Sequence, residues 1–421
     1  MNNKHYRLGF ISTRLAGTDG VSLETAKWAH ILTALGHECF CFAGVTDWSS
    51  ERSYIVPEAH FLHAEILAIT ADLFGNNIRT QHTSQRIQVL KDHLKAHLDK
   101  FVSRFQPDIL IAENVLSLPV NVPLGLALTE FIAERGIPVI AHHHDFAWDR
   151  ERFDLNAAND YLRAAFPPVL PSIHHVVINS FAARQLAMRT GERSVLIPNV
   201  INFDAPTPTA DVLTNEFRRV LGIAATEMVL LQPTRIVPRK RIERSIELAR
   251  RLKLPCVLVI THSSGDEGNS YEAYLKEFAS LLNVRVIFAA DKIGTERGQK
   301  PDGTTIFSLT DAYLQANLVT YPSAVEGFGN AFLETIYYRR PIIMSSYEIF
   351  TVDIKPKGFK VITFSEFISD STIDEVVNLL HKPELVAEIV EQNFAIGRRY
   401  YSYNVLEKNL VMLIRDSVGA S

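Results

Sequence analysis

Short apolar runs alternate with longer stretches of helical periodicity along almost the whole chain, and this alternation limits the fold more than any other feature. Residues 8–12, 109–112 and 174–179 are such runs, and each is followed by a helix-like segment. Strands that are separated by helices along a chain form parallel sheets with helices on both faces. The sequence therefore predicts an α/β fold.

The alternation stops once, near the middle of the chain, and then begins again. Residues 200–225 contain Pro206 and Pro208 and no sustained apolar pattern, so they are predicted to be a linker. Further strands are expected at 228–233, 256–261, 284–289, 318–321 and 341–344, whereas glycine-rich 291–306 is expected to be a loop. We predict an N-terminal domain at 1–205, a C-terminal domain at 206–395 and a final helical segment at 396–421.

Composition sets broad limits on location and partners. The 421 residues are 47% hydrophobic, which is enough for two cores, and a net charge of −4 gives no reason to expect nucleic acid as a partner. Cys39, Cys41 and Cys256 form no regular disulfide framework, which favours a reducing compartment. We find no signal-peptide core and no apolar run long enough to cross a membrane, so we expect a cytoplasmic protein.

Residues 326–334, which read EGFGNAFLE, combine two carboxylates with a glycine-rich turn between an expected strand and an expected helix. Gly327, Gly329 and Asn330 allow a ligand to approach the backbone closely, and the amides of a helix start favour an anion. Glu326 and Glu334 suit hydroxyl groups, because an ionised carboxylate accepts several hydrogen bonds. This combination indicates a sugar phosphate or a nucleotide sugar. The plainer alternative is a capped helix with two surface glutamates.

A basic loop at 234–241 follows the expected strand at 228–233 and precedes an amphipathic helix at about 242–252. Arg235 and Lys240 would neutralise a diphosphate, the arginine through two nitrogens and the lysine as a point charge. The alternative is an exposed basic run at a helix start, but cations there oppose the helix dipole, which favours a bound anion. Arg239 and Arg241 are expected to face solvent.

Together, the two segments resemble the E-x7-E motif and the Arg-x4-Lys pair of retaining GT-B glycosyltransferases of family 4. The sequences HHHDF at 142–146 and TYPS at 320–323 are similar to the branch that includes mannosylglucosylglycerate synthases. The resemblance implies two Rossmann-like domains that face a central cleft. It implies an acceptor-binding N-terminal domain, a C-terminal domain that binds the nucleotide sugar, and a last helix that crosses back to the N-terminal domain.

The resemblance also implies roles for the C-terminal motifs. Arg235 and Lys240 would stabilise the leaving phosphate, and Glu326 would hold hydroxyl groups of the donor sugar. Glu334 would bind the ribose of the nucleotide. The donor would also meet the backbone amides of Phe328, Gly329 and Asn330.

The loop at 14–20 resembles the first glycine-rich loop of the family, although it is neither a G-x-G-x-x-G fingerprint nor a P-loop. The resemblance implies that the amide of Gly20 meets the donor diphosphate. Arg14 and Asp19 could instead contact an acceptor. Ser22 and Glu24 are also consistent with ordinary helix-start chemistry.

Three consecutive histidines, His142, His143 and His144, end a predicted strand. Neighbouring strand residues point to opposite faces, so all three cannot easily bind one ion, and we predict no metal site. His144 followed by Asp145 best matches the family histidine that lies near the donor sugar, although an alignment through His143 stays open. The other reading is that one or two of these histidines only satisfy backbone groups. The acceptor side would be lined by Asp145, Trp148, Arg150 and Arg152, which suit an acidic acceptor.

The resemblance therefore implies a retaining hexosyltransferase that uses GDP-mannose or a UDP-sugar and a small acidic acceptor such as a glycerate glycoside. We expect no tightly bound cofactor. The chain contains no Asp-x-Asp, so metal dependence through that motif is not expected, although a loosely bound Mg²⁺ stays open. Other readings are a GT-B nucleotide-sugar epimerase, a phosphorylase relative and a non-catalytic sugar-nucleotide-binding protein.

Overall fold

The computed structural model describes residues 4–17, 19–265 and 268–419. The chain divides into two compact units. The first unit comprises Met1–Asn199 together with Asn404–Ser421, and the second comprises Val200–Tyr403. The chain therefore enters the second unit at residue 200 and returns to the first unit at residue 404.

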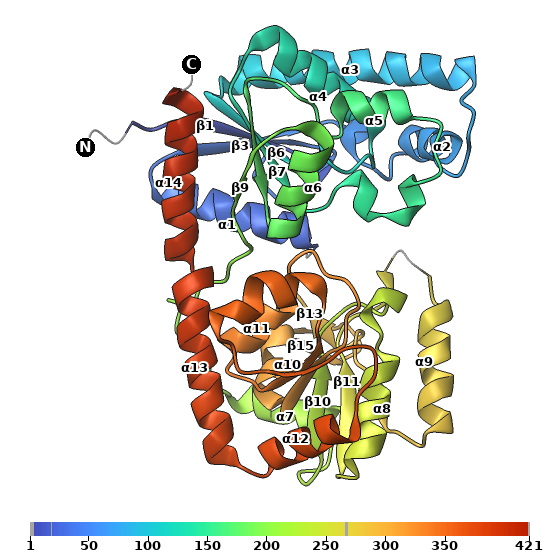
Figure 1. Cartoon of the computed structure of the whole chain (residues 1–421), viewed down its shortest axis with the longest axis vertical. Helices are drawn as coiled ribbons and strands as arrows, with labels where there is room; N and C mark the ends of the chain where they lie inside the picture. Colours follow the sequence, from blue (N-terminus) through green and yellow to red (C-terminus); the bar gives the residue numbers. More distant parts are fainter. Residues whose placement is uncertain (1–3, 18, 266–267, 420–421) are drawn as a thin grey trace. The chain divides into compact units, whose positions relative to one another are not determined.

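The first unit is built on a parallel sheet of seven strands in the order β5-β3-β1-β6-β7-β8-β9 (Figure 1). Its strands are β1 (Arg7–Ile11), β3 (Glu38–Ala43), β5 (Ser53–Ile55), β6 (Ile109–Glu113), β7 (Val139–His143), β8 (Ile173–Val177) and β9 (Ser194–Leu196). Its helices are α1 (Gly20–Ala34), α2 (Ala64–Leu73), α3 (Gln81–Phe105), α4 (Val122–Arg135), α5 (Asn159–Ala165), α6 (Ser180–Thr190) and α14 (Tyr403–Gly419). Two short strands, β2 (Arg14–Leu15) and β4 (Val45–Thr46), pair with each other in a separate small sheet.

Alternation along the strands decides which face of this sheet each helix covers. Phe42 and Leu110 point to the face that α3 and α4 cover, where they join a core that includes Leu98 and Phe101 of α3. The opposite face carries α1, whose buried Trp28 stacks on His142 of β7 with ring centroids 4.2 Å apart. Both faces are buried, as the near-continuous apolar strands predict.

The second unit contains a parallel sheet of six strands in the order β12-β11-β10-β16-β17-β18. Figure 1 labels two of them, β10 and β11. Its strands are β10 (Met228–Gln232), β11 (Cys256–Ile260), β12 (Val286–Phe288), β16 (Leu318–Tyr321), β17 (Ile342–Ser345) and β18 (Ile362–Phe364). Its helices are α7 (Val212–Val220), α8 (Glu243–Leu252), α9 (Ser270–Leu281), α10 (Leu309–Gln315), α11 (Asn330–Tyr337), α12 (Asp370–Leu380) and α13 (Pro383–Tyr401). The α/β fold predicted from the alternation is confirmed.

Two segments of this unit are more ordered than the sequence indicated. The predicted linker contains α7, and the predicted loop at 291–306 contributes to a small sheet of β13 (Ile293–Gly294), β14 (Gly298–Gln299) and β15 (Thr305–Ser308). Phe217 of α7 is fully buried against Phe307 of β15, with ring centroids 5.1 Å apart. Arg297 bridges the same segments by bonding to both Asp211 and Asp311. These long-range contacts stabilise both segments.

Among the described residues, no helix is both long and apolar enough to span a membrane. The polar segments singled out from the sequence follow the carboxyl ends of β1, β7, β10 and β16. Ligands of parallel α/β sheets bind beyond these strand ends, so the fold places the segments where binding residues are expected.

Candidate active site

The two C-terminal motifs follow neighbouring strands of the second sheet. β10 leads into the basic loop, and β16, which pairs with β10, leads into the turn that contains Glu326. Because parallel strands end at the same edge, the two loops lie together. The backbone N–H of Ala324 donates to the carbonyl of Arg239 at 2.8 Å, which joins them directly.

Lys240 and Glu326 form a direct ion pair at this edge. Each side chain is only 9% exposed, so solvent screens the pair weakly. Burial lowers the pKa of Lys240, although the charge of Glu326 opposes that effect. Burial would raise the pKa of Glu326, but the charges of Lys240 and Arg239 outweigh it and lower the value. The carboxylate is therefore ionised and the pair is charged.

Arg239 is the second cation beside Glu326, with its Nη1 at 3.6 Å from Oε2. Arg239 therefore faces solvent only in part: its side chain is 30% exposed, and the 3₁₀ turn Pro238–Lys240 also places it beside the carboxylate. Arg241 forms an ion pair with Glu366 at 3.1 Å at the surface, and Arg235 is exposed.

His262 was missed by the sequence analysis. It follows β11, the strand next to β10, and its Nδ1 lies 2.8 Å from the hydroxyl oxygen of Thr261. Burial lowers the pKa of His262, and the charges of Lys240 and Arg235 lower it further. A neutral imidazole therefore stands beside the cationic loop. The available signal was a Thr-His pair immediately after a buried apolar strand.

Gly329 cannot be replaced without strain at the start of α11. Its φ is +114°, and a Cβ there would lie 2.5 Å from the hydroxyl oxygen of Tyr347. That hydroxyl donates to the carbonyl of Phe328 at 2.8 Å, so the ring is held in place. The backbone at 328–330 is thus fixed in a conformation that glycine permits.

Glu334 lies one turn into α11, where its Oε2 accepts a hydrogen bond of 2.9 Å from the Tyr313 hydroxyl. Tyr313 is fully buried on α10, and burial next to Glu334 raises its pKa far above the usual value. The tyrosine therefore stays a donor at any physiological pH and fixes the orientation of the carboxylate. Sequence analysis did not identify Tyr313, which looks like a core aromatic residue.

In the first unit, side chains of the loop at 14–20 bond to other groups of the same loop and of the helix start. Asp19 caps α1, since its Oδ1 accepts from the amides of Val21 and Ser22 at 3.1 and 3.2 Å. Arg14 pairs with Asp19 at 3.1 Å, and Gly20 is the first helical residue. Thr18 lies outside the described residues. A diphosphate at Gly20 would meet the Asp19 carboxylate, which must move or stay paired with Arg14.

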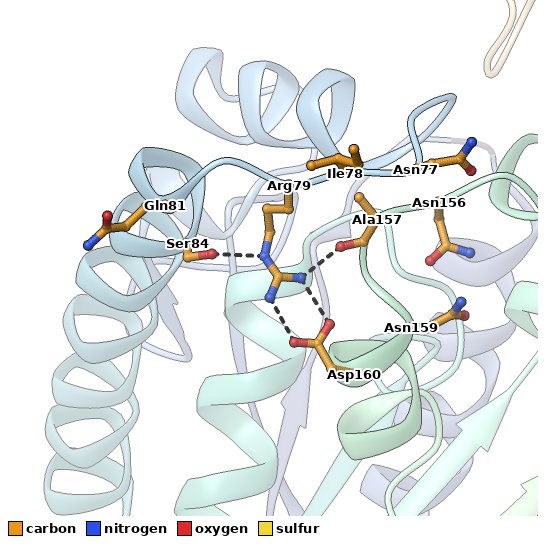
Figure 2. Close-up of a pocket in the computed structure, with 9 residues that line it drawn as sticks. All are labelled: Asn77, Ile78, Arg79, Gln81, Ser84, Asn156, Ala157, Asn159 and Asp160. Carbon is orange, nitrogen blue, oxygen red and sulfur yellow. Dashed lines mark hydrogen bonds and ion pairs between the residues drawn. The ribbon is translucent and has the colours of Figure 1, made fainter.

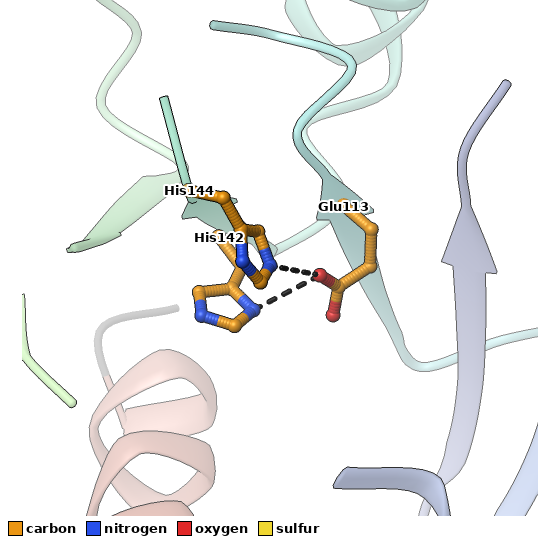
Figure 3. A group of neighbouring side chains, drawn as sticks. All are labelled: Glu113, His142 and His144. Atoms are coloured by element: carbon orange, nitrogen blue, oxygen red, sulfur yellow. Dashed lines mark hydrogen bonds and ion pairs between the residues drawn. The ribbon is translucent and has the colours of Figure 1, made fainter. Parts of the chain in front are cut away.

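The three histidines divide between the two faces of β7, as alternation predicts. His142 and His144 approach Glu113 at the end of β6, with His142 Nδ1 at 2.9 Å and His144 Nε2 at 3.4 Å from its Oε2 (Figure 3). His143 points the other way, and its Nε2 lies 2.9 Å from Nδ1 of His175 on β8. The sequence analysis missed Glu113, although it ends a strand expected to lie beside the histidine strand.

Asn114 shapes the loop that presents His144. Its φ is +59°, and its Oδ1 accepts from the backbone amides of His144 and Asp145 at 3.0 and 3.2 Å. Asparagine tolerates this left-handed conformation better than most residues. The side chain therefore fixes the position of the backbone directly after β7.

The proposed acceptor residues of the first unit form separate ion pairs. Arg150 bonds to Asp145 at 2.9 Å, whereas Arg14 belongs to the pair with Asp19. Arg152 is exposed, and its guanidinium lies over the Phe153 ring at 4.6 Å. The structure thus brings Asp145 and Arg150 together directly beyond His144.

A separate hollow of about 630 Å³ opens in the first unit between the segment before α3 and the start of α5 (Figure 2). Its lining is polar: Asn77, Ile78, Arg79, Gln81, Ser84, Asn156, Ala157, Asn159 and Asp160. Figure 2 shows that Arg79 bonds to both carboxylate oxygens of Asp160, at 2.9 and 2.7 Å. The Arg79 cation in this hollow is thus already paired with Asp160. None of the predicted site residues lines the hollow.

Comparison with known proteins decides the family. No family model matches the chain. A curated relative, mannosylglucosylglycerate synthase of Thermotoga maritima, is 31% identical over 96% of this chain and 96% of its own length. The chain belongs to the mannosylglucosylglycerate synthase branch of the GT-B glycosyltransferases. It is therefore a hexosyltransferase.

Solved structures support the same fold for this family member. A glycosyltransferase of Rickettsia africae matches with a TM-score of 0.69 at 13% identity, covering 99% of this chain and 100% of the other. The Anabaena HepE protein, solved in complex with UDP-glucose, matches with a TM-score of 0.64 at 12% identity over 98% and 100%. At such identities these likenesses establish the GT-B fold.

Proposed function

We propose that this hexosyltransferase moves a mannosyl group from GDP-mannose to glucosylglycerate with retention of anomeric configuration. The sugars follow from the name of the Thermotoga relative. The observation that carries the chemistry is the buried Lys240–Glu326 pair beside Arg239, at the carboxyl ends of β10 and β16.

In this proposal, the basic loop stabilises the departing diphosphate. Lys240 and Arg239 both contact Glu326, and Arg235 is exposed, so its guanidinium can reach an arriving phosphate. Negative charge grows on the leaving oxygen as the bond to the anomeric carbon breaks. Fixed cations in a poorly screened position stabilise that state more than the ground state.

The turn and helix after β16 would hold the rest of the donor. Glu326 accepts hydrogen bonds from hydroxyl groups of the sugar, and the Tyr313-oriented Glu334 accepts from the ribose. The backbone amides of Phe328, Gly329 and Asn330 meet the phosphates. The positive φ of Gly329 supports this role, because glycine adopts it without strain and lets a ligand approach the backbone closely.

The first unit would contribute His144 to the donor sugar and Gly20 to the diphosphate. Arg150, with Asp145 and Arg152 nearby in sequence, would bind the carboxylate of the acceptor, and Arg14 is a second candidate. Arg150 forms an ion pair with Asp145 in the structure. The carboxylate of an acidic acceptor would replace part of that interaction. A phosphorylated acceptor would suit the same arginines.

Retention requires that the acceptor oxygen reaches the face from which the diphosphate leaves. We propose that an oxygen of the leaving diphosphate takes the acceptor proton. In this scheme the cationic loop stabilises the charge on the diphosphate, and the carboxylates bind hydroxyl groups. No side-chain base is required, because the diphosphate takes the proton. Mg²⁺ is not essential in this account, and an assay in EDTA tests that directly.

A thermal-shift panel with GDP, UDP, ADP and their sugar conjugates tests the donor class. A ligand that binds only the folded chain raises the melting temperature by mass action. We expect GDP and GDP-mannose to stabilise the protein and Arg235→Ala to lose most of that shift, whereas Arg250→Ala on the exposed side of α8 keeps it. Stabilisation by UDP compounds alone would refute GDP-mannose, and no shift with any nucleotide would refute donor binding.

A further inference from the structure

Glu113 is a buried carboxylate for which the proposed chemistry has no role. Its side chain is 0% exposed, and two histidines approach the same oxygen, Oε2 (Figure 3). The other oxygen, Oε1, is buried and has no hydrogen-bond partner among the described residues. An ionised carboxylate in such a place needs a compensating positive charge, because isolated buried charges are very costly.

The compensating charge resides on one of the two histidines. Burial would raise the pKa of Glu113, but His142 and His144 lower it to about 2, so the carboxylate is ionised. Burial lowers the pKa of His142, which also lies flat against the Trp28 ring. Burial acts in the same direction on His144, but the hydrogen bond and charge of Glu113 outweigh it and raise the pKa.

The hydrogen-bond geometry gives the same assignment. His142 donates its Nδ1–H to Glu113, and its Nε2 is buried without a partner among the described residues. A neutral imidazole leaves only an acceptor at that position, whereas an imidazolium would bury an unpaired N–H donor. His142 is therefore the neutral member of the group. His144 donates its Nε2–H to the same carboxylate oxygen.

We propose that Glu113 is a positioning residue that holds His144 as an imidazolium ion, so that Nδ1 of His144 donates a hydrogen bond to the nucleotide-sugar donor. With Nε2–H on Glu113, a neutral His144 could only accept at Nδ1, and a protonated one donates there. The inference rests on the proposed function for its ligand. The charge state of His144 itself does not depend on that function.

The other ionisable groups that face His144 favour the same state. Glu24 on α1 is 1% exposed and its negative charge also raises the pKa of His144, while its Oε1 is paired with Lys27 at 2.5 Å. Asp145, the next residue, adds a further negative charge. Lys27, which pairs with Glu24, is a cation near this group, whereas the neighbouring His142 is neutral and adds no positive charge.

A divalent cation is the competing occupant of this position. One atom from each of Glu113, His142 and His144 lies within 4.8 Å of the others, and zinc binds such ligands at about 2.0–2.2 Å. A proton and a metal make opposite predictions. The proton account requires His144 to titrate, whereas bound metal would fix both imidazoles as neutral ligands.

The decisive experiment is an NMR titration of the full chain carrying ¹⁵N-labelled histidine, with His144→Gln used to assign the resonance. We expect wild-type His144 to keep both ring N–H protons at pH values above its ordinary 6.5. In Glu113→Gln its titration should move down by about 1–3 pH units, and Glu113→Asp should restore part of it. A wild-type His144 that is neutral at pH 6.5 overturns the proposal without any variant.

Transfer kinetics provide the second arm. The alkaline limb of the kcat/KM profile should follow the His144 titration and move to lower pH in Glu113→Gln, with part of the shift restored in Glu113→Asp. If the wild type transfers hexose and Glu113→Gln leaves that profile unchanged, the inference fails while the proposed function stands. If no nucleotide sugar supports transfer, the proposed function fails, and the NMR arm still decides the charge of His144. A zinc-induced rise in melting temperature that His144→Gln abolishes overturns the proton account.

Discussion

Lys240 has two roles in the proposed site, one in stability and one in turnover. It neutralises Glu326 in the ligand-free protein, and it would stabilise the leaving diphosphate during the reaction. Both groups are nearly buried, so removal of Lys240 leaves a poorly solvated carboxylate whose remaining ion-pair contact is with Arg239 at 3.6 Å. Arg235 is exposed and has no such structural burden.

This difference predicts distinct effects of two substitutions in one loop. Arg235→Ala and Lys240→Ala should both lower kcat/KM by about 10²–10³-fold, the usual cost of a lost transition-state contact. Only Lys240→Ala should also destabilise the protein, by up to about 3 kcal/mol. Turnover and urea unfolding measure the two effects, with Arg250→Ala as the control. Normal turnover in either variant would refute the leaving-group assignment.

Gly329 provides a purely steric test of the donor loop. Gly329→Ala places a methyl group 2.5 Å from the Tyr347 hydroxyl at a φ of +114°. We expect transfer to fall below a tenth of the wild-type rate and stability to fall by about 1–3 kcal/mol.

The matched control for this substitution is Gly298→Ala, where a Cβ meets nothing within 4 Å and φ is not positive. Melting curves and initial rates on both variants are sufficient. If Gly329→Ala retained wild-type affinity for donor, the backbone at 328–330 would not contact the phosphates.

At the scale of elements, residues at the ends of β6 and β7 fix the position of His144. Asn114 follows β6 in a left-handed conformation and accepts both backbone amides of the loop after β7. Asn114→Gly keeps the conformation but removes the acceptor. We expect kcat/KM to fall by roughly 10–100-fold because His144 is no longer held in place.

Ser117 supplies the control, since its hydroxyl also donates to Asn114 Oδ1 at 2.9 Å, whereas its contact with the loop after β7 uses the backbone carbonyl, which Ser117→Ala keeps. Ser117→Ala should change kcat/KM less than threefold. Equal losses in both variants would show that general loosening, not the position of His144, limits the reaction.

The contact between β7 and β8 makes the first unit sensitive to acid. Burial and the charge of His174 lower the pKa of His175 to about 4, below its ordinary 6.5. The folded state therefore binds this proton less well than the unfolded chain. The corresponding stability is complete above pH 6.5, and it is lost as pH falls from 6.5 towards 4. Alone, this shift corresponds to roughly 3 kcal/mol.

Urea unfolding at pH 7 and pH 5 measures this effect. The wild type should lose stability between the two values, and His175→Gln should show a smaller difference because the titrating group is gone. His82→Gln on the exposed side of α3 is the control and should behave as wild type. An equal pH dependence in wild type and His175→Gln would show that other groups cause it.

Strong hydrophobic periodicity made most strands and helices predictable from the sequence. Prediction failed where contacts between residues far apart in the sequence stabilise an element. The strand at 318–321 was expected with the bounds that the structure gives. Helix α7 was not, because its order depends on Phe217 meeting Phe307 and on Arg297 bridging two aspartates.

The same limit applies to the candidate site. Motif spacing identified Lys240 and Glu326, but only strand pairing shows that they form one ion pair. Glu113 and Tyr313 resemble core residues in the sequence, and their partners become visible only when β6 lies beside β7 and α10 beside α11.

For the whole molecule, membership of the mannosylglucosylglycerate synthase branch and the arrangement of each unit support one reaction. The central claim is hexosyl transfer with retention from a nucleotide sugar. It requires that a product forms, that its new bond is at the anomeric carbon, and that this carbon keeps the donor configuration.

The most direct measurement is NMR of the product formed from GDP-mannose and glucosylglycerate, with the one-bond carbon–hydrogen coupling at the new anomeric centre as the readout. We expect an α-mannosyl product from the α-configured donor, and about 10²–10³-fold less of it with Lys240→Ala at equal enzyme and time. A β-linked product would contradict retention. Release of free mannose without a glycoside would contradict the transfer itself.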